Sequence, residues 1–305
     1  MKVCSGTDQP RVACPERGMV LVVVLWIVTL LAVMAGGFAY SMRIETRLAT
    51  STVERAQARA WIEAGVAYAL AWQLEPEAQQ QWPPNGDPRE WSFGGGRLRI
   101  EVVDAGGLIN LNTADSELLG TLLAVVDVDP QDRERLADAI QDWRDPDDQP
   151  LPRGAESAEY RAAGRPGPKN APFESVEELG QVLGMTQEVY ERIAGVATVF
   201  SHHAGVDPEL APARLLRALG LDEQTVADYV GARTSASTAA EGASPPPPPP
   251  WPGDGPSFFF QSRSRVYHIV VTAETASGAV AIAEAVADGQ GTAIGQGIRW
   301  LAWRW

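Results

Sequence analysis

The sequence predicts an α+β protein with a long N-terminal helix, an antiparallel sheet and a large all-α insertion. Three patterns support this prediction. An uncharged run at residues 19–42 continues into a helical repeat, strand patterns occur near both ends of the remaining chain, and helical periodicity fills the region between them. Because strand patterns lie on both sides of residues 104–232, we expect this region to be inserted into the sheet domain.

The uncharged run is long enough to cross a membrane. It comprises 24 residues from Met19 to Met42, and a bilayer core needs about 20 apolar residues in helical form. The apolar core of an ordinary secretory signal is shorter, roughly 7–15 residues. Basic residues outnumber acidic ones in residues 1–18, which favours a cytoplasmic position for this leader. We therefore expect a single-pass membrane protein.

The helical pattern continues through residues 43–74. The sequence has no proline between Met19 and Leu74, so a single helix of 56 residues is allowed. Small and apolar residues recur mainly at three- and four-residue steps, and this stripe predicts a packing face against a sheet or another helix. The stripe consists of Ile44, Leu48, Ala56, Ala60, Ala64, Ala67, Leu70, Ala71 and Leu74.

The sheet is predicted from alternating segments. Residues 75–103 read as a loop up to residue 96, because of their proline and glycine content, followed by a strand at 97–103. The C-terminal part, residues 258–305, is predicted to contribute the remaining strands. They are a hairpin at 265–272 and 279–286, and a further strand at 298–305 that places its tryptophans against the helix.

The predicted insertion reads as a series of helical hairpins. Ala114–Leu122 and Ala211–Leu219 share the spacing of their apolar residues. Asp129 is a good N-cap before a proline, and Ser175 with Glu178 has the capping-box spacing. Each of these signals predicts the start of a helix.

A proline-rich linker is predicted at residues 233–257. Its small polar residues and prolines cannot bury enough apolar surface to form a core. The six prolines Pro245–Pro250 are expected to form an extended polyproline II spacer. A role for this run in recruiting a partner is the alternative.

An acidic cluster in the insertion is the main candidate for chemistry. Asp142, Asp145, Asp147 and Asp148 fall within seven residues. Such carboxylates repel one another unless solvent or a cation screens them, and calcium takes six to eight oxygen ligands. The spacing does not match an EF-hand loop. The residues alone leave both a solvated acidic loop and a metal site open.

Composition and motifs argue against two other functions. The chain has three histidines and no nucleophile elbow, zinc-ligand spacing or phosphate loop, so we expect no enzymatic activity. A membrane-anchored helix-hairpin-helix protein for DNA binding or uptake is the rival interpretation, because turns such as Leu183-Gly184-Met185 are similar to those of DNA-binding hairpins. The net charge of −14 and the acidic residues at the helix starts argue against nucleic acid.

The N-terminal region resembles the class III signal of type IV pilins and type II secretion pseudopilins. Arg17-Gly18 directly precedes the apolar run. The resemblance implies that prepilin peptidase cleaves between Gly18 and Met19 and that the new amino group of Met19 is methylated. Most of that superfamily has Glu at the fifth mature position, where this chain has Val23, and this departure is expected of the minor pseudopilin K family. A carboxylate in the bilayer costs about 2.5–3.5 kcal/mol unless it is neutralised, and a subunit at the tip has no amine above it to pair with one.

The acidic region resembles the helical domain of the same family. The resemblance is carried by residues 138–148, 154–160 and 169–185, and with the leader and the helix it covers nearly the whole chain. It implies a pilin-like fold and a structural minor pseudopilin at the tip of the pseudopilus, which initiates or caps assembly for protein export across the outer membrane.

The same resemblance implies location, partners and a metal. The protein would lie in the bacterial inner membrane with a periplasmic C-terminal part. Its partners would be minor pseudopilins I, J and H, the major pseudopilin, prepilin peptidase and the inner-membrane secretion platform, with no nucleic acid. Calcium would bind in the helical domain. The candidate ligands are Asp142, Asp145, Asp147, Asp148, Glu156 and Glu159.

Overall fold

The computed structural model describes residues 17–126, 128–238, 245–251, 257–275, 278–290 and 297–305. The chain divides into two compact units, Met1–Gln57 and Ala58–Trp305. Most of the predicted leader, with both cysteines, lies outside the described residues.

The first unit is helical throughout its described part. It belongs to α1, which runs from Arg17 to Leu74 and begins two residues before the predicted helix. Its segment from Met19 onward is the one described helix that is long and apolar enough to cross a membrane. The apolar side chains of this segment are exposed, and the hydroxyl of Thr29 donates to the carbonyl of Leu25 one turn earlier. This internal hydrogen bond satisfies a polar group that lipid could not satisfy.

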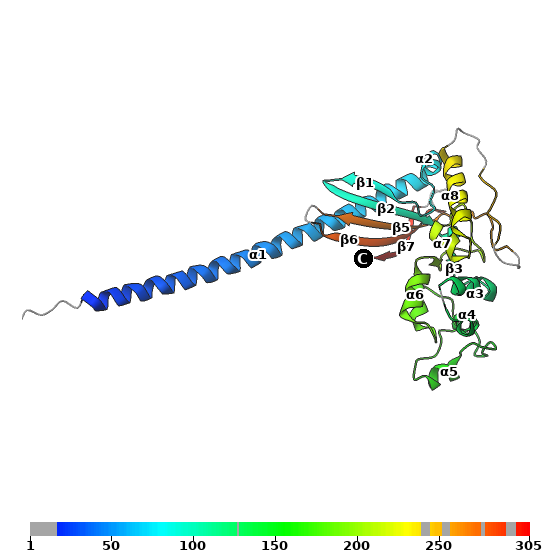
Figure 1. Ribbon diagram of the computed structural model, residues 1–305, viewed down its shortest axis with the longest axis horizontal. Coiled ribbons are helices and arrows are strands. Elements are labelled where there is room, and N and C mark those ends of the chain that lie inside the picture. Colours follow the sequence, from blue (N-terminus) through cyan, green and yellow to red (C-terminus); the bar gives the residue numbers. More distant parts are fainter. Residues whose placement is uncertain (1–16, 127, 239–244, 252–256, 276–277, 291–296) are drawn as a thin grey trace, which may run out of the picture. The chain divides into compact units, whose positions relative to one another are not determined.

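The second unit contains a five-stranded antiparallel sheet of order β1-β2-β5-β6-β7 (Figure 1). The strands are β1 (Arg89–Phe93), β2 (Gly96–Asp104), β5 (Val266–Glu274), β6 (Val280–Asp288) and β7 (Arg299–Arg304). β2 and β5 pair from Arg97 opposite Glu274 to Asp104 opposite Tyr267. Strands far apart in the sequence are therefore neighbours, as the sequence predicts.

The C-terminal part of α1 covers one face of this sheet. Trp61, Ile62 and Val66 share a hydrophobic cluster with Leu98, Ile100 and Val102 of β2, with residues of β5 and β6, and with the partly buried Trp303 of β7. A Cβ atom at Gly65 would lie 2.9 Å from Val271 Cγ1, so this glycine permits close approach of helix and sheet.

The alanine stripe predicted to pack is not the face that meets the sheet. Ala60, Ala67 and Ala71 are exposed, whereas one sequence neighbour of each is buried, namely Trp61, Val66 and Leu70. The larger side chains of Trp61, Ile62 and Val66 remove more apolar area from water than alanines do, and burial stabilises in proportion to that area. Of the predicted stripe, Leu70 is buried against the sheet, and packing of the exposed alanines against another helix stays a prediction.

The predicted loop at 75–96 contains two regular elements. Helix α2 (Pro76–Gln81) has a proline in its first turn, where the missing N–H costs nothing. Strand β1 pairs with β2 through Gly94 and Gly95, whose φ values are +60° and +86°. Two successive positive φ values suit a two-residue hairpin turn, and glycine adopts them without strain.

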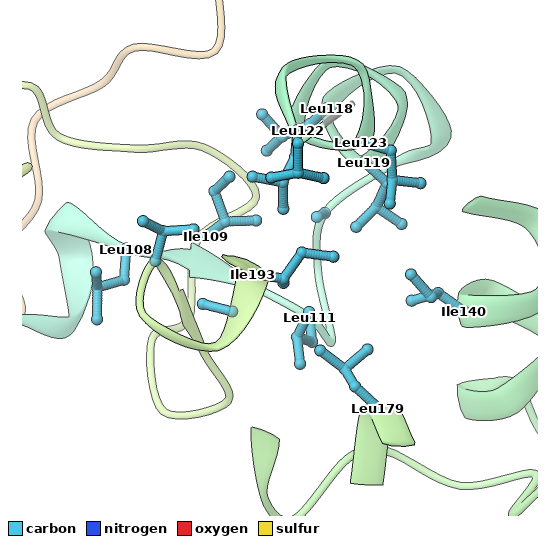
Figure 2. Packing of buried hydrophobic residues seen from close by; sticks show 14 of the residues in the cluster. Leu108, Ile109, Leu111, Leu118, Leu119, Leu122, Leu123, Ile140, Leu179 and Ile193 are labelled. Atoms are coloured by element: carbon cyan, nitrogen blue, oxygen red, sulfur yellow. The ribbon is translucent and has the colours of Figure 1, made fainter. Parts of the chain in front are cut away.

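The helical section between β2 and β5 has its own core. Its helices are α3 (Ser116–Val125), α4 (Pro130–Arg144), α5 (Ser157–Ala162), α6 (Gln187–Ala194), α7 (Ala213–Ala218) and α8 (Glu223–Thr238), with short helices η1 (Ala105–Gly107) and η2 (Val176–Gln181) and paired strands β3 (Ile109–Asn110) and β4 (Ala197–Thr198). Figure 2 shows Leu118 and Leu122 of α3 together with Ile140, Leu179 and Ile193 in one buried cluster.

Both predicted capping signals open a helical element in the structure. Asp129 accepts a hydrogen bond from the Gln131 amide at the start of α4. Ser175 and Glu178 form the predicted capping box, although the element they open is the 3-10 helix η2. α5 was not predicted. Thr186 caps α6 after Gly184, which has a φ of +90°.

The boundaries of the predicted linker differ from the structure. α8 continues to Thr238 and so includes the first six residues of the segment 233–257. Arg233 is buried and donates to the carbonyls of Pro208 and Ala211, which holds this end of the helix in place. After the linker, Phe258 and Phe260 pair with Val206 through backbone hydrogen bonds, and the sheet resumes only at Val266.

Candidate functional site

Three of the predicted carboxylates meet at the junction of α4 and α5. Asp142 lies in the last turn of α4, Asp145 is the C-cap of α4, and Glu156 is the N-cap of α5. One carboxylate oxygen from each residue lies within 4.8 Å of the other two. Asp142 and Glu156 are fully buried, at 0% and 1% exposure. We call Asp142, Asp145 and Glu156 the carboxylate cluster.

Asp142 organises the loop that joins the two helices. Its carboxylate accepts hydrogen bonds from the amides of Leu151 at 3.2 Å and Ala155 at 2.7 Å. A Cβ atom at Gly154 would fall 1.8 Å from Asp142 Oδ2, so only glycine lets the loop pass this close. The loop is therefore built around a buried charge.

The other two members of the cluster carry oxygen atoms without donors. By strict hydrogen-bond geometry, neither oxygen of Glu156 nor Oδ1 of Asp145 accepts from an N–H or O–H donor among the described residues, although all three atoms are buried. The group that meets the Glu156 side chain is the carboxyl group of Asp148. An unsatisfied buried polar atom is costly, and an unpaired buried charge more so. Their arrangement leaves three oxygen atoms available to a ligand.

The electrostatics of the cluster reflect this concentration of negative charge. Burial, reinforced by the charges of Asp142, Asp145 and Asp148, raises the pKa of Glu156 to about 7. Burial also raises the pKa of Asp142, against the two backbone hydrogen bonds that it accepts, and that of Asp145. The cluster therefore takes up a proton readily when no cation balances it.

The remaining predicted ligands lie outside this cluster and hold backbone groups. Asp147 is exposed, and its Oδ1 accepts from the Gln149 amide. Asp148 adjoins the cluster through the Glu156 side chain, and hydrogen bonds from Ser157 lower the pKa of Asp148. Glu159 Oε2 accepts from the amide of Glu156 at 2.9 Å, as the N3 residue of a capping box does.

Sequence reasoning did not select Asn170, which lies beside this loop. Its Nδ2 donates to the carbonyl of Asp147 at 2.5 Å, and its Oδ1 is buried without a partner among the described residues. Its φ of +48° is the only positive value among the described non-glycine residues. Asparagine tolerates this conformation better than most residues, and nothing in the spacing of the acidic residues indicates it.

The donor set of the cluster fits a hard cation. All three residues offer carboxylate oxygens and no nitrogen or sulfur, which suits calcium or magnesium better than zinc or copper. The unpartnered oxygens and the raised pKa of Glu156 are the features that a divalent cation would relieve. Asn170 Oδ1 adds a neutral oxygen near the same loop.

The helix starts that resemble DNA-binding hairpins hold the chain's own acidic side chains. Asp222 Oδ1 accepts from the Thr225 amide at 3.0 Å before α8, and Asp129 caps α4. A phosphate group of a nucleic acid would need these same amides as hydrogen-bond donors. The geometry gives no support to a nucleic-acid site at these turns.

The positions predicted for processing lie at the start of α1. Gly18 and Met19 belong to its first turn, and Val23 is 51% exposed within the apolar segment. Val23 is about as exposed as Val22 and Val24, so its environment in the helix does not distinguish it from them.

Comparison with known proteins identifies relatives of the chain. Residues 101–202 match the family model for protein K of the type II secretion system. Type II secretion system protein K of Klebsiella pneumoniae is 29% identical over 58% of this chain and 61% of its own length. The corresponding protein of Dickeya chrysanthemi is 22% identical over 58% of this chain and 64% of its own length. The chain thus spans somewhat less than two thirds of these relatives.

A solved structure shares the fold. A chain of the GspK-GspI-GspJ complex from the type II secretion system of enterotoxigenic Escherichia coli has a TM-score of 0.56 and 15% identity, over 83% of this chain and 97% of that one. The matched family is a structural component of a secretion system and not an enzyme family. The resemblance to minor pseudopilin K that the sequence predicts is confirmed by the family model, the relatives and the pilin-like α+β fold.

Proposed function

We propose that this chain is a structural minor pseudopilin at the tip of the type II secretion pseudopilus, where it initiates or caps assembly for protein export across the outer membrane. The observation that carries the proposal is a single helix, α1, whose first part is apolar and exposed and whose last part packs on a sheet. The match at residues 101–202 supports the assignment. The helical section would add bulk above the sheet domain and so block addition of further subunits.

In this proposal, α1 joins a bundle with the helices of neighbouring subunits. The exposed alanines Ala67 and Ala71 line a groove of about 800 Å³ whose other wall includes Trp300, Trp303 and Trp305. Small residues let a second helix approach closely. Minor pseudopilins I and J are the first candidates, and the structural match to a chain of a GspK-GspI-GspJ complex supports these two. H and the major pseudopilin would lie beneath them.

Co-purification tests this assembly. The full chain would be expressed in inner membranes with minor pseudopilins I and J of the same bacterium, extracted in detergent and isolated through a tag on I. We expect a stable complex with wild type and loss of this chain with Ala67→Trp, which fills the groove. Glu117→Trp, on an exposed position of α3, is the matched control and should be retained. A wild-type chain that elutes alone would contradict the proposal.

Processing and orientation form a second part of the proposal. Prepilin peptidase would cleave between Gly18 and Met19 and methylate Met19. The leader would lie in the cytoplasm and the C-terminal part in the periplasm. Assembly would take place at the inner-membrane platform. Amino-terminal analysis of the protein from membranes should give N-methyl-Met19. An intact leader would contradict this part alone.

Calcium binding by the carboxylate cluster is the third part. Asp142, Asp145 and Glu156 would hold the ion, which would lock the loop between α4 and α5. Calorimetry of the chelator-treated full chain should show calcium-dependent heat. The Glu156→Gln variant should bind calcium at least tenfold more weakly than wild type. Asp147→Asn keeps the oxygen that caps Gln149 and lies outside the cluster, so it should bind as wild type does. Absence of calcium-dependent heat in wild type would refute the site.

A further inference from the structure

The run Pro245–Pro250 has a conformation that its own covalent structure determines. Proline fixes φ near −65°, and a residue before proline is kept out of the helical region. The run therefore forms a polyproline II helix, with three residues per turn and about 3.1 Å rise per residue. Positions three apart lie on one ridge, so the six prolines make three ridges of two.

One ridge faces the protein and two face solvent. Pro249 is buried and Pro246 is half-buried, whereas Pro245, Pro247, Pro248 and Pro250 are exposed. The covered prolines are three residues apart, as the three-residue period requires. The exposed ridges are Pro245 with Pro248 and Pro247 with Pro250, which we call the proline ridges.

The C-terminal end of the run is anchored to the helical section. The Trp251 ring lies 5.2 Å from the rings of Phe258 and Phe259 in edge contacts, and all three side chains pack against the helical core. The Val206 amide donates to the Phe258 carbonyl at 2.9 Å, and the Phe260 amide donates to that of Val206 at 3.1 Å. This segment therefore loses its conformational entropy when the chain folds, and binding of a partner does not require a further loss.

We propose that the proline ridges are a docking site for a partner protein with an uncharged, aromatic-lined groove. Grooves of this kind recognise proline-rich segments through prolines on two adjacent ridges of a polyproline II helix. The run carries no charge, and the nearest charged residues in the sequence are Glu241 and Asp254. Recognition therefore rests on ring stacking and on hydrogen bonds to proline carbonyls, which lack competing N–H groups, and not on an ion pair beside the groove.

Accessibility of the ridges is tested with the full chain in detergent. The probe is a purified WW domain, whose aromatic groove binds proline-rich segments, and its affinity is measured by calorimetry beside a free peptide of residues 244–251. We expect the folded chain to bind at least as tightly as the peptide. Pro247→Ala with Pro250→Ala should weaken binding at least tenfold, whereas Pro166→Ala, an exposed proline elsewhere, should not. Binding to the peptide but tenfold weaker binding to the folded chain would overturn the proposal.

The existence of a cellular partner is tested by crosslinking. A photoreactive residue at position 248 should give one discrete adduct with another protein in the producing bacterium, lost when Pro247 and Pro250 are alanine and absent when the reactive residue is at position 166. No adduct, or an adduct only with a second copy of this chain, would refute the partner. Co-purification with minor pseudopilins I and J is a separate readout, and the proline variants should leave it unchanged.

Discussion

At the scale of the residue, Asp104 couples protonation to folding. It is 1% exposed at the end of β2 and accepts a hydrogen bond from the Gly106 amide at 2.8 Å. Burial, with a contribution from the charge of Asp207, raises its pKa to about 7. The unfolded chain releases this proton near the ordinary value of 3.8. The folded state thus holds the extra proton between these values, and stability should fall as the pH rises through that window.

Removing the titration should flatten this dependence. Asp104→Asn keeps an oxygen for the Gly106 amide and carries no charge. Titration of Asp104 should lower the urea midpoint of wild type between pH 5 and pH 8. The midpoint of the Asp104→Asn variant should decrease clearly less over the same range. Asp228→Asn, on an exposed face of α8, should behave as wild type. An unchanged slope in the Asp104 variant would show that its charge is not expelled by folding.

Glu156 gives the proposed calcium site its own pH response. Because its pKa is raised to about 7, a proton competes with the cation below that pH. The apparent calcium affinity should fall about tenfold per pH unit below 7 and level off above it. Calorimetry at several pH values measures this slope, and a flat profile from pH 5.5 to 8.5 would remove Glu156 from the ligand set.

At the scale of the element, long periodic patterns predicted the structure well. α1 and the strands at β2, β5 and β6 follow from repeats of at least seven residues, which report the buried face directly. β1 was missed because five residues between proline and glycine carry little periodic information. The stripe on α1 was assigned to the sheet only in part, because the apolar faces of one helix differ in side-chain size and the sheet packs on the face with the bulkier side chains, which shares Leu70 with the stripe.

The site was predicted in part for a similar reason. Spacing located the acidic loop but did not indicate which carboxylates turn inward. Asp142 and Glu156 are brought together by the Leu151 and Ala155 amides, and Asp147 and Asp148 instead accept local backbone hydrogen bonds. Asn170 carries no charge, so the pattern of acidic residues does not indicate it. It lies beside the acidic loop only in the folded chain.

Two glycines in regular elements should respond oppositely to alanine. A Cβ at Gly96 would lie 2.6 Å from the Trp61 ring, so Gly96→Ala must displace that ring and should destabilise the sheet by about 1–3 kcal/mol. Gly120 in α3 has nothing within 4 Å, and Gly120→Ala should stabilise by roughly 0.5–1 kcal/mol. Urea unfolding of both variants measures the pair, and destabilisation by Gly120→Ala would contradict the helix assignment.

At the scale of the whole molecule, a chain of polar contacts joins the sheet to the helical section. Thr198 of β4 contacts His268 of β5, which contacts Glu284 of β6 at 3.2 Å. Arg304 of β7 then bridges Glu284 at 3.2 Å and Glu177 of η2 at 2.7 Å. The first and last elements in this series of contacts, β4 and η2, both belong to the helical section, and the contacts between them run through the sheet.

Arg304 should therefore matter more than a neighbouring surface arginine. Arg304→Ala removes charged hydrogen bonds to two glutamates and should cost about 1–3 kcal/mol. Arg299→Ala breaks an ion pair in which the arginine is 73% exposed, and it should cost less than about 1 kcal/mol. Denaturant midpoints compare the two, and equal losses would show that the bridge does not couple the sections.

The pairing of β2 with β5 also imposes an order on events during synthesis. β2 ends at Asp104 and its partner begins at Val266, so the ribosome must make residues 105–265 before these strands can meet. At roughly 5–20 residues per second this takes on the order of 8–30 s. Throughout that interval the free edge of β2 has no strand beside it, while the helical section has time to fold on its own core. A nascent chain of this protein is therefore most exposed to mispairing before β5, Val266–Glu274, emerges.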